Sequence, residues 1–434
     1  MRFRVLGGLL FLLGAALVGA ACVGDDPAVG GGQTQDGGTL ADGAPIDGSG
    51  SEDGSGPPPC GTPNAACCAG NACNGGSQCN GTICVCPGDL TACGSTCVDT
   101  KTSVAHCGRC DHDCFGGSCG ASKCAAYTVT PSQTNVRHMF TNGGRIYWSR
   151  GTSASTTGAF LSAKLDGTDL VSIHDAGMNP CAGGTVALGK AYFACFNGTT
   201  HDIRQCTLPC AAGSSTIFKA GVASLSNVVA DPATGTVYYA VPTPYNQAPN
   251  GLVLDTAGNR VGAIGQANPN DLTIANGFIY WLNSGTYAAD TAQKNGGVKR
   301  ASLAAIGTEN VVVSSGANYF DNSTLAVDTN NVYYAGRELS PNETDVVFGN
   351  VTAAGAAPTV FANNVGAYVA SDGTNVFFDE PGTNSVRYCS RAGGCGGGKT
   401  LLSASEASVS ALVVDADSVL WAKFGGEIRR IAKP

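Results

Sequence analysis

The sequence predicts an all-β protein, a seven-bladed β-propeller of four-stranded blades, preceded by a small disulfide-rich module. Three observations support this prediction: a short aromatic motif returns seven times in 434 residues, glycine is abundant with 62 copies, and most cysteines crowd into one segment. Strands favour aromatic and β-branched residues, and the tight turns between short strands need glycine. The elements are taken below in chain order.

The chain begins with MRFRVLGGLLFLLGAALVGAAC, a short basic segment followed by an apolar run. This pattern predicts that residues 1–21 are a secretory signal peptide. Small residues before Cys22 also resemble the bacterial lipobox, although Gly19 stands where that family prefers leucine. We therefore expect an exported lipoprotein of the outer membrane, at the cell surface or in the periplasm, that contacts the membrane only through a lipid on Cys22. Signal cleavage without lipidation is the alternative.

The next segment, residues 22–59, continues from Cys22 into an acidic sequence rich in glycine and aspartate. It has almost no large apolar side chains, so burial cannot offset the loss of chain entropy. We expect a disordered linker that tethers the following domains.

Residues 60–124 form the predicted disulfide-rich module, with 14 cysteines. The whole chain has 21 cysteines, and setting Cys22 aside leaves 20, an even number. In an exported protein this arithmetic predicts ten disulfides, which replace a hydrophobic core in small modules.

The second half of the module, CGSTCVDTKTSVAHCGRCDHDC, carries a recognisable cysteine pattern. With Asp99 and with His106 before Cys-Gly-x-Cys, it resembles the Stig1-type repeat of plant and myxobacterial exported proteins. The resemblance implies no known chemistry. Cys107 and Cys110, flanked by His106 and His112, could instead ligate zinc. Because every neighbouring segment is also rich in cysteine, we favour disulfides and predict no metal and no cofactor.

From residue 125 onward an apolar residue followed by two aromatic or bulky residues recurs. The copies are IYW at 146, AYF at 191, VYY at 237, IYW at 279, VYY at 332, VFF at 376 and VLW at 419. Successive copies are 45, 46, 42, 53, 44 and 43 residues apart. Seven copies with a period near 45 predict seven four-stranded blades over residues 125–434.

An aspartate or asparagine stands four residues before the aromatic motif in several copies. These residues are Asn142, Asp328, Asp372 and Asp415. Such side chains bind the backbone of a turn, so we interpret them as turn formers. A calcium ring or a catalytic set is less favoured, because Ala187 and Ala275 occupy the same offset in other copies.

Third and fourth strands follow each aromatic strand, for example HDIRQC and STIFKA in the second copy. The last copy ends at Pro434 without a fourth strand, whereas AYTVT at 126–130 precedes the first copy. We predict that this N-terminal segment supplies the outer strand of the last blade and so closes the ring.

Six cysteines fall within the repeats. Their spacing and equivalent positions predict three disulfides, Cys181 with Cys195, Cys206 with Cys210, and Cys389 with Cys395. A nucleophilic cysteine is not expected when all six have partners.

Recognition is expected in the long loops between second and third strands, at 149–159, 241–251, 282–297 and 336–345. The candidate binding residues in these loops are Arg150, Tyr245, Tyr287, Asp290, Arg337 and Glu338. The alternative is that the loops are only solvated turns. The net charge of −8, without a Lys/Arg block after residue 4, argues against nucleic acid.

No catalytic constellation is visible, since the five histidines share no position in the repeats and no linear catalytic motif occurs. The first repeat, IYWSR before AKLDGT, resembles the YWTD and NHL-like propeller families, although Ser149 and Arg150 replace the Thr-Asp of the YWTD pattern. This resemblance implies binding of an unknown protein or glycan. We therefore expect a non-catalytic binding or adhesion scaffold, and no catalytic residues. The alternatives are a propeller hydrolase or lyase acting on extracellular polymer, and a purely structural envelope protein.

Overall fold

The structure is a computed structural model that describes residues 60–151, 158–243, 247–288, 291–292, 296–314, 318–319, 324–338, 345–351 and 359–434. The described residues form strands and two short 3-10 turns, η1 (Ala69–Asn71) and η2 (Pro381–Thr383). These residues include no helix with the length and apolar character needed to cross a bilayer. The all-β class is confirmed. The chain divides into Met1–Pro57 and Pro58–Pro434, and only the second unit is described below.

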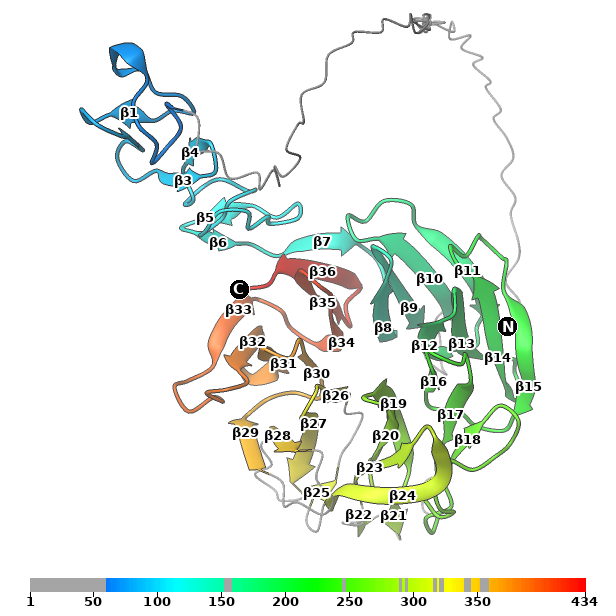
Figure 1. The fold of residues 1–434 in the computed structure, drawn as a ribbon. Coiled ribbons are helices and arrows are strands. Elements are labelled where there is room, and N and C mark those ends of the chain that lie inside the picture. Colours follow the sequence, from blue (N-terminus) through cyan, green and yellow to red (C-terminus); the bar gives the residue numbers. More distant parts are fainter. Residues whose placement is uncertain are drawn as a thin grey trace, which may run out of the picture. The chain divides into compact units, whose positions relative to one another are not determined.

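Seven sheets follow one another along the repeat region and surround a common axis (Figure 1). The first two sheets are β8 (Val136–Asn142), β9 (Arg145–Arg150), β10 (Gly158–Lys164) and β11 (Val171–Gly177), then β12 (Cys181–Ala187), β13 (Lys190–Phe196), β14 (His201–Thr207) and β15 (Thr216–Val222). The third and fourth are β16 (Val228–Ala230), β17 (Val237–Val241) and β18 (Leu252–Asp255), then β19 (Pro269–Ala275), β20 (Phe278–Asn283), β23 (Gly297–Ser302) and β24 (Ala305–Ser314).

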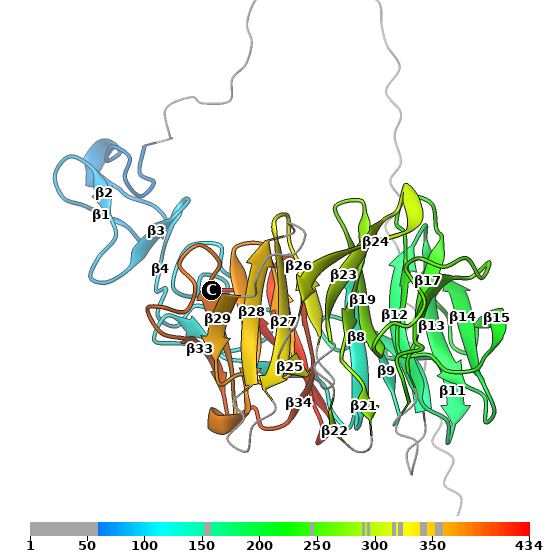
Figure 2. The ribbon, with the colours of Figure 1, turned by 90° about the horizontal axis from the view of Figure 1, so that it is seen from below.

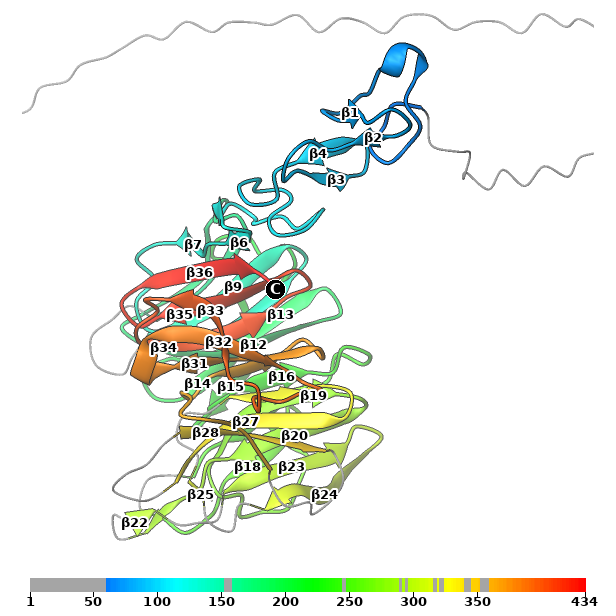
Figure 3. The ribbon, with the colours of Figure 1, turned by 90° about the vertical axis from the view of Figure 1, so that its left-hand side faces the viewer.

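The remaining three sheets complete the ring. In the fifth, β25 (Asn318–Tyr319) and β26 (Leu325–Val327) both pair with β27 (Asn331–Glu338), followed by β28 (Asp345–Val351) and β29 (Thr359–Asn363). The sixth is β30 (Val369–Ser371), β31 (Asn375–Glu380), β32 (Ser385–Ser390) and β33 (Thr400–Ala404). The seventh is β34 (Val409–Val414), β35 (Ser418–Lys423), β36 (Glu427–Ala432) and β7 (Tyr127–Thr130). Figures 2 and 3 show that the strands run along the axis of the ring.

Among the described residues, the prediction of four strands in every blade is wrong for the third sheet, which has three. In the fifth sheet two short strands, β25 and β26, pair with successive parts of the inner edge of β27 in place of one inner strand. After β18 the chain turns at Asp255, whose Oδ1 accepts a hydrogen bond from the Asn259 backbone N–H at 2.8 Å. The returning segment then makes only the isolated bridges Gly251↔Gln266 and Leu254↔Arg260. The segment that returns beside β18 therefore takes the outer position without forming a regular fourth strand.

The prediction of ring closure is confirmed. β7 pairs antiparallel with β36, with Arg429 opposite Thr128 and Ile428 opposite Thr130. Val129 of β7 is buried with residues of the first and seventh sheets. The N-terminal strand therefore covers an edge of the last sheet that would otherwise be open.

The aromatic motif lies on the second strand of each sheet and is buried between sheets. Trp148, Trp281 and Trp421 are fully buried, and the rings of Phe160 and Phe193 stack at 3.9 Å between the first two sheets. Each indole N–H donates to a side chain 15 residues earlier in the chain. The acceptors are Gln133 Oε1 at 3.2 Å, Gln266 Oε1 at 3.0 Å and Glu406 Oε2 at 2.9 Å.

The aspartates before the aromatic motif are turn formers, as predicted. Oδ1 of Asp372 accepts hydrogen bonds from the backbone N–H groups of Thr374 at 2.8 Å and Asn375 at 2.7 Å. Asp328 and Asp415 accept equivalent pairs of backbone hydrogen bonds.

The module consists of three small hairpins joined by disulfides. The hairpins are β1 (Gln78–Cys79) with β2 (Cys84–Val85), β3 (Thr91–Cys93) with β4 (Thr96–Val98), and β5 (Cys119–Gly120) with β6 (Lys123–Cys124). The disulfides are Cys60–Cys68, Cys67–Cys79, Cys73–Cys84, Cys86–Cys97, Cys93–Cys110, Cys107–Cys119 and Cys114–Cys124.

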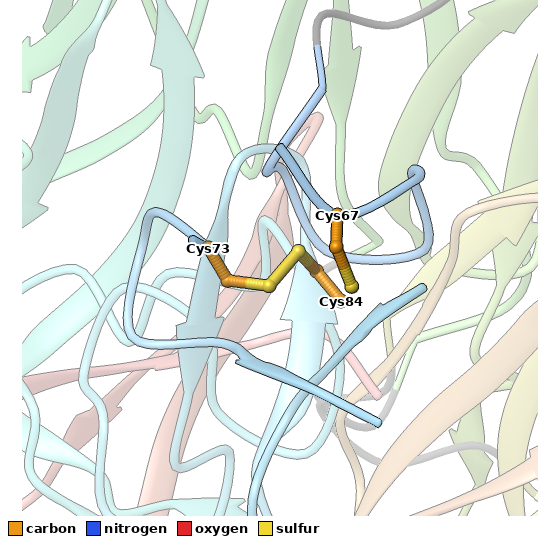
Figure 4. Close-up of side chains that lie close together, drawn as sticks. All are labelled: Cys67, Cys73 and Cys84. Atoms are coloured by element: carbon orange, nitrogen blue, oxygen red, sulfur yellow. A yellow bond between two sulfur atoms is a disulfide. The ribbon is translucent and has the colours of Figure 1, made fainter. Parts of the chain in front are cut away.

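This pairing bears on the zinc alternative. Cys107 and Cys110 have different partners, so neither sulfur is a thiolate, the form that binds zinc. The same holds where Cys67, Cys73 and Cys84 lie close together (Figure 4).

The propeller contains the disulfides Cys181–Cys195, Cys206–Cys210 and Cys389–Cys395. All 20 cysteines after Cys22 are therefore paired. Ten disulfides in one chain are typical of proteins outside the reducing cytoplasm, in the extracellular space or the periplasm.

Candidate functional site

A cavity of about 440 Å³ lies on the axis of the propeller. All seven sheets contribute to its wall, mainly through the residues at or just before the start of the innermost strands. The lining consists of Asn135, Val136, Arg137, His138, Ala182, Gly183, Leu225, Ser226, Asn227, Asn270, Asp271, Thr324, Tyr368, Ser410 and Phe424. Because the innermost strands all begin at the same end of the ring, polar residues at these starts converge on the axis.

Hydrogen bonds between neighbouring sheets hold part of this wall. Asn227 Nδ2 donates to Asp271 Oδ1, and the Leu325 backbone N–H donates to Asp271 Oδ2 at 2.7 Å. Thr324 Oγ1 accepts a hydrogen bond from the Val369 backbone N–H at 2.8 Å. The third, fourth, fifth and sixth sheets are thereby linked at the cavity, which makes this wall rigid.

Gly183 lets the second sheet approach this network closely. Its φ is +59°, a conformation that favours glycine. A Cβ at this position would lie 2.7 Å from Asn227 Oδ1 and 2.7 Å from the Val228 backbone nitrogen. Any side chain there would displace Asn227 from its place beside Asp271.

Asp271 is the acidic group of the cavity. Burial raises its pKa to about 6, against the lowering effect of hydrogen bonds from Leu325, Asn227 and Leu272. At neutral pH the carboxyl is mostly ionised, and all the hydrogen bonds that it receives come from uncharged N–H groups.

His138 lies in the wall formed by the first sheet. Burial lowers the pKa of its imidazole to about 4, so the ring is neutral at pH 7. Its Nδ1 atom is buried and has no hydrogen-bond partner among the described residues. The ring centroid lies 6.2 Å from that of Phe140.

Arg137 supplies the positive charge of the cavity. Its side chain is exposed, and Nε donates to the Gly151 carbonyl oxygen at 3.1 Å. Gly151 directly follows β9, at the start of the loop predicted to carry recognition. The cavity and this loop therefore lie at the same end of the propeller.

The candidate loop residues are only partly described. Arg150 ends β9, half-buried, and its Nη1 donates to Gln133 Oε1 at 3.4 Å, so it supports the wall without lining the cavity. Tyr287 begins the short strand β21 (Tyr287–Ala288), which pairs with β22 (Thr291–Ala292) inside a segment expected to be a loop. Arg337 and Glu338 end β27, opposite Tyr319 and Asn318. Tyr245, Asp290 and Cys22 lie outside the described residues.

Sequence reasoning missed Arg137, His138, Asn227 and Asp271. Each of these residues lies at or next to the start of an innermost strand, as in SNVVA and PNDLTIA. This position identifies a residue as cavity-lining only when the strand starts are known to surround the axis. A cavity lined only by apolar, glycine and serine residues could not support acid–base catalysis. This cavity contains Asp271 and His138, so its lining does not exclude an enzyme.

No protein-family model matches the sequence, and no curated protein matches it. Among solved structures, the chain is similar to Kuenenia stuttgartiensis hydrazine synthase, with a TM-score of 0.51, 12% identity, and coverage of 70% of this chain and 96% of that chain. The β-propeller domain of the Trilobed protease from Pyrococcus furiosus has a TM-score of 0.46 and 10% identity, covering 67% of this chain and 91% of that chain. TolB from Acinetobacter baumannii has a TM-score of 0.40 and 10% identity, covering 67% and 64%. At these identities the likeness concerns the propeller fold alone.

Proposed function

We propose that the protein is an exported, lipid-anchored, non-catalytic binding protein that takes its ligand in the axial cavity. The observation that carries this proposal is the cavity itself, to which all seven sheets contribute. A concave site on a rigid scaffold, with a few convergent polar groups, is the usual form of a ligand site. Its volume suits a small polar molecule, or the end of a protein or glycan chain.

Binding is favoured over catalysis by the arrangement of the titratable groups. Asp271 belongs to the fourth sheet and is held by three N–H donors, whereas His138 belongs to the first sheet and has a buried Nδ1 atom. A general acid and a general base must both reach the reacting atoms. Two groups on separate walls, one of them buried at its ring nitrogen, suit recognition better than proton transfer.

Filling the cavity tests this proposal. Asn270→Trp would place a large side chain in the cavity, and Leu401→Trp, on the exposed outer strand β33, is the matched control. The probes are maltotriose, chitotriose and trialanine, measured by titration calorimetry with the chain from residue 60 onward. We expect at least one probe to bind the wild-type protein. Its affinity should fall tenfold or more with Asn270→Trp but not with Leu401→Trp. The probe should be chemically unchanged after the measurement. Absence of binding, equal binding by both variants, or conversion of the bound probe contradicts the proposal.

The proposed anchor is tested separately by palmitate labelling in a bacterial host. Wild type should incorporate label, and Cys22→Ala should not. An unlabelled wild-type protein contradicts lipidation without affecting the cavity proposal.

A further inference from the structure

We propose that the axial cavity binds a short zwitterionic peptide, with the peptide carboxylate at Arg137 and its ammonium group at Asp271. This inference rests on the proposed function, because it names the ligand class of the same cavity.

Arg137 and Asp271 lie on opposite walls. Arg137 belongs to β8 of the first sheet and Asp271 to β19 of the fourth. In a ring of seven sheets the first and fourth face each other across the axis, and Figure 1 shows β8 and β19 on opposite sides of the central space. A molecule that spans the cavity therefore meets a positive charge at one end and a negative charge at the other.

Arg137 has donors to spare. Its Nε donates to the Gly151 carbonyl oxygen, which fixes the side chain and leaves both terminal nitrogens. Within the part of the chain that the structure describes, no carboxylate forms an ion pair with this guanidinium. Paired terminal N–H groups match the two oxygens of a carboxylate, the geometry in which arginine binds most strongly.

Asp271 lines the cavity and keeps unused acceptor capacity. Oδ1 accepts from Asn227 Nδ2 and from the Leu272 backbone N–H at 3.0 Å, whereas Oδ2 accepts only from the Leu325 backbone N–H at 2.7 Å. A carboxylate has about four acceptor sites, so Oδ2 has one remaining. None of the three donors carries a charge, and an ammonium group would therefore provide the counter-charge that a partly desolvated carboxylate lacks.

The two charges together exclude simpler ligands. An anion alone would meet Arg137 but bring a like charge toward Asp271, and a cation alone would do the reverse. A neutral sugar would displace water from both charges without neutralising either. His138 does not change this balance, since its imidazole is neutral at pH 7.

The space between the charges suits a peptide backbone. Asn270 lines the cavity, and its side-chain amide has no hydrogen-bond partner among the described residues, so it is available to pair with a peptide group. An extended peptide spans roughly 3.3–3.6 Å per residue, so two to four residues separate its charged ends by about the width of a small cavity. Phe424, half-exposed in the lining, offers an apolar contact for a peptide side chain.

Blocking each end of the ligand tests the inference on the wild-type chain. The probes are di-, tri- and tetraalanine, together with their N-acetylated and C-amidated forms, measured by calorimetry at pH 7.5. We expect one free peptide length to bind best and each capped form to bind at least tenfold more weakly. Capped peptides that bind as well as the free ones overturn the inference.

Variants assign each end to a wall. Arg137→Gln should abolish the preference for the free carboxylate over the amide, and Asp271→Asn the preference for the free amine over the acetylated form. Lys164→Gln, at an exposed cation of β10, is the control and should change neither preference. If Asp271→Asn does not fold, the capped peptides still decide the outcome.

Two results separate this inference from the proposed function. Tighter binding of maltotriose than of any peptide, lost with Asn270→Trp, overturns the peptide assignment and leaves the cavity as the ligand site. Peptide binding that Asn270→Trp does not weaken overturns both.

Discussion

The tryptophans of the aromatic motif illustrate how single residues stabilise this fold. In the repeats that carry tryptophan, the residue 15 positions earlier is glutamine or glutamate and accepts the indole hydrogen bond. In the second repeat Phe193 takes the place of tryptophan, and the residue 15 positions earlier is Met178, which is exposed. A hydrogen-bond acceptor thus stands at this position in the repeats that contain tryptophan, and it is absent in the second repeat. The reason is that a buried N–H group without an acceptor is costly.

This pairing predicts the effect of removing one acceptor. Gln133→Leu should lower the free energy of unfolding by about 1–3 kcal/mol, because the buried Trp148 N–H loses its partner. Gln133→Glu keeps an oxygen and should cost less. Met178→Leu should have no measurable effect, and urea unfolding of the three variants checks the order. A Met178→Leu loss equal to that of Gln133→Leu would contradict the role given to the acceptor.

Strand β7 differs from the other propeller strands because it precedes the first repeat in the sequence but belongs to the last sheet. Tyr127 Oη donates to the Leu165 carbonyl oxygen at 2.8 Å, and Arg429 Nη2 donates to the Ala126 carbonyl oxygen at 3.0 Å. The strand thus contacts both the first and the last sheet and joins them.

Substitutions on the buried and exposed faces of β7 should have different effects on stability. Val129 is buried and Thr128 is exposed. Val129→Asp should destabilise the protein by about 3 kcal/mol, since it buries a charge without a partner. It should also make the segment before β8 sensitive to protease. Thr128→Asp should leave the unfolding midpoint and the cleavage pattern unchanged. Equal behaviour of both variants would show that β7 does not close the ring.

At the scale of the whole molecule, two half-buried groups in the cavity wall give the stability opposing dependences on pH. The pKa of His138 is lowered in the fold, so its contribution is complete above about pH 6.5 and is lost as pH falls toward 4. The pKa of Asp271 is raised, so its contribution is complete below about pH 4 and is lost as pH rises through 6.

Replacing His138 isolates one of these dependences. One unit of pKa corresponds to roughly 1.4 kcal/mol, so wild type should lose about 3 kcal/mol relative to His138→Phe between pH 7 and pH 4. The measurement is urea unfolding of both proteins across that range. A difference that does not change with pH would show that His138 titrates normally in the fold.

Much of the architecture could be predicted from the sequence, because the same strand and turn pattern occurs in seven copies and each copy supports the same assignment. The ring of sheets and the turn aspartates depend on short-range patterns, and closure by 126–130 followed from counting strands in the first and last repeats. The missing fourth strand of the third sheet was not predicted, because the segment after Asp255 pairs with β18 only through isolated bridges that no local pattern indicates. The cavity was not predicted, since its wall is assembled from all seven sheets, and Arg137 and Asp271 line it only because the sheets form a ring.

The pairing of β7 with β36 also sets the order in which the molecule can be completed. β7 is the first propeller strand to be synthesised and β36 is the last, and their contacts join residues 303 positions apart. Until β36 is made, β7 has no strand to pair with and its edge stays open beside the first sheet. A chain interrupted before Glu427 therefore has open strand edges at both β7 and β35. The propeller can close only once β36 has been made, and until then β7 presents an open edge.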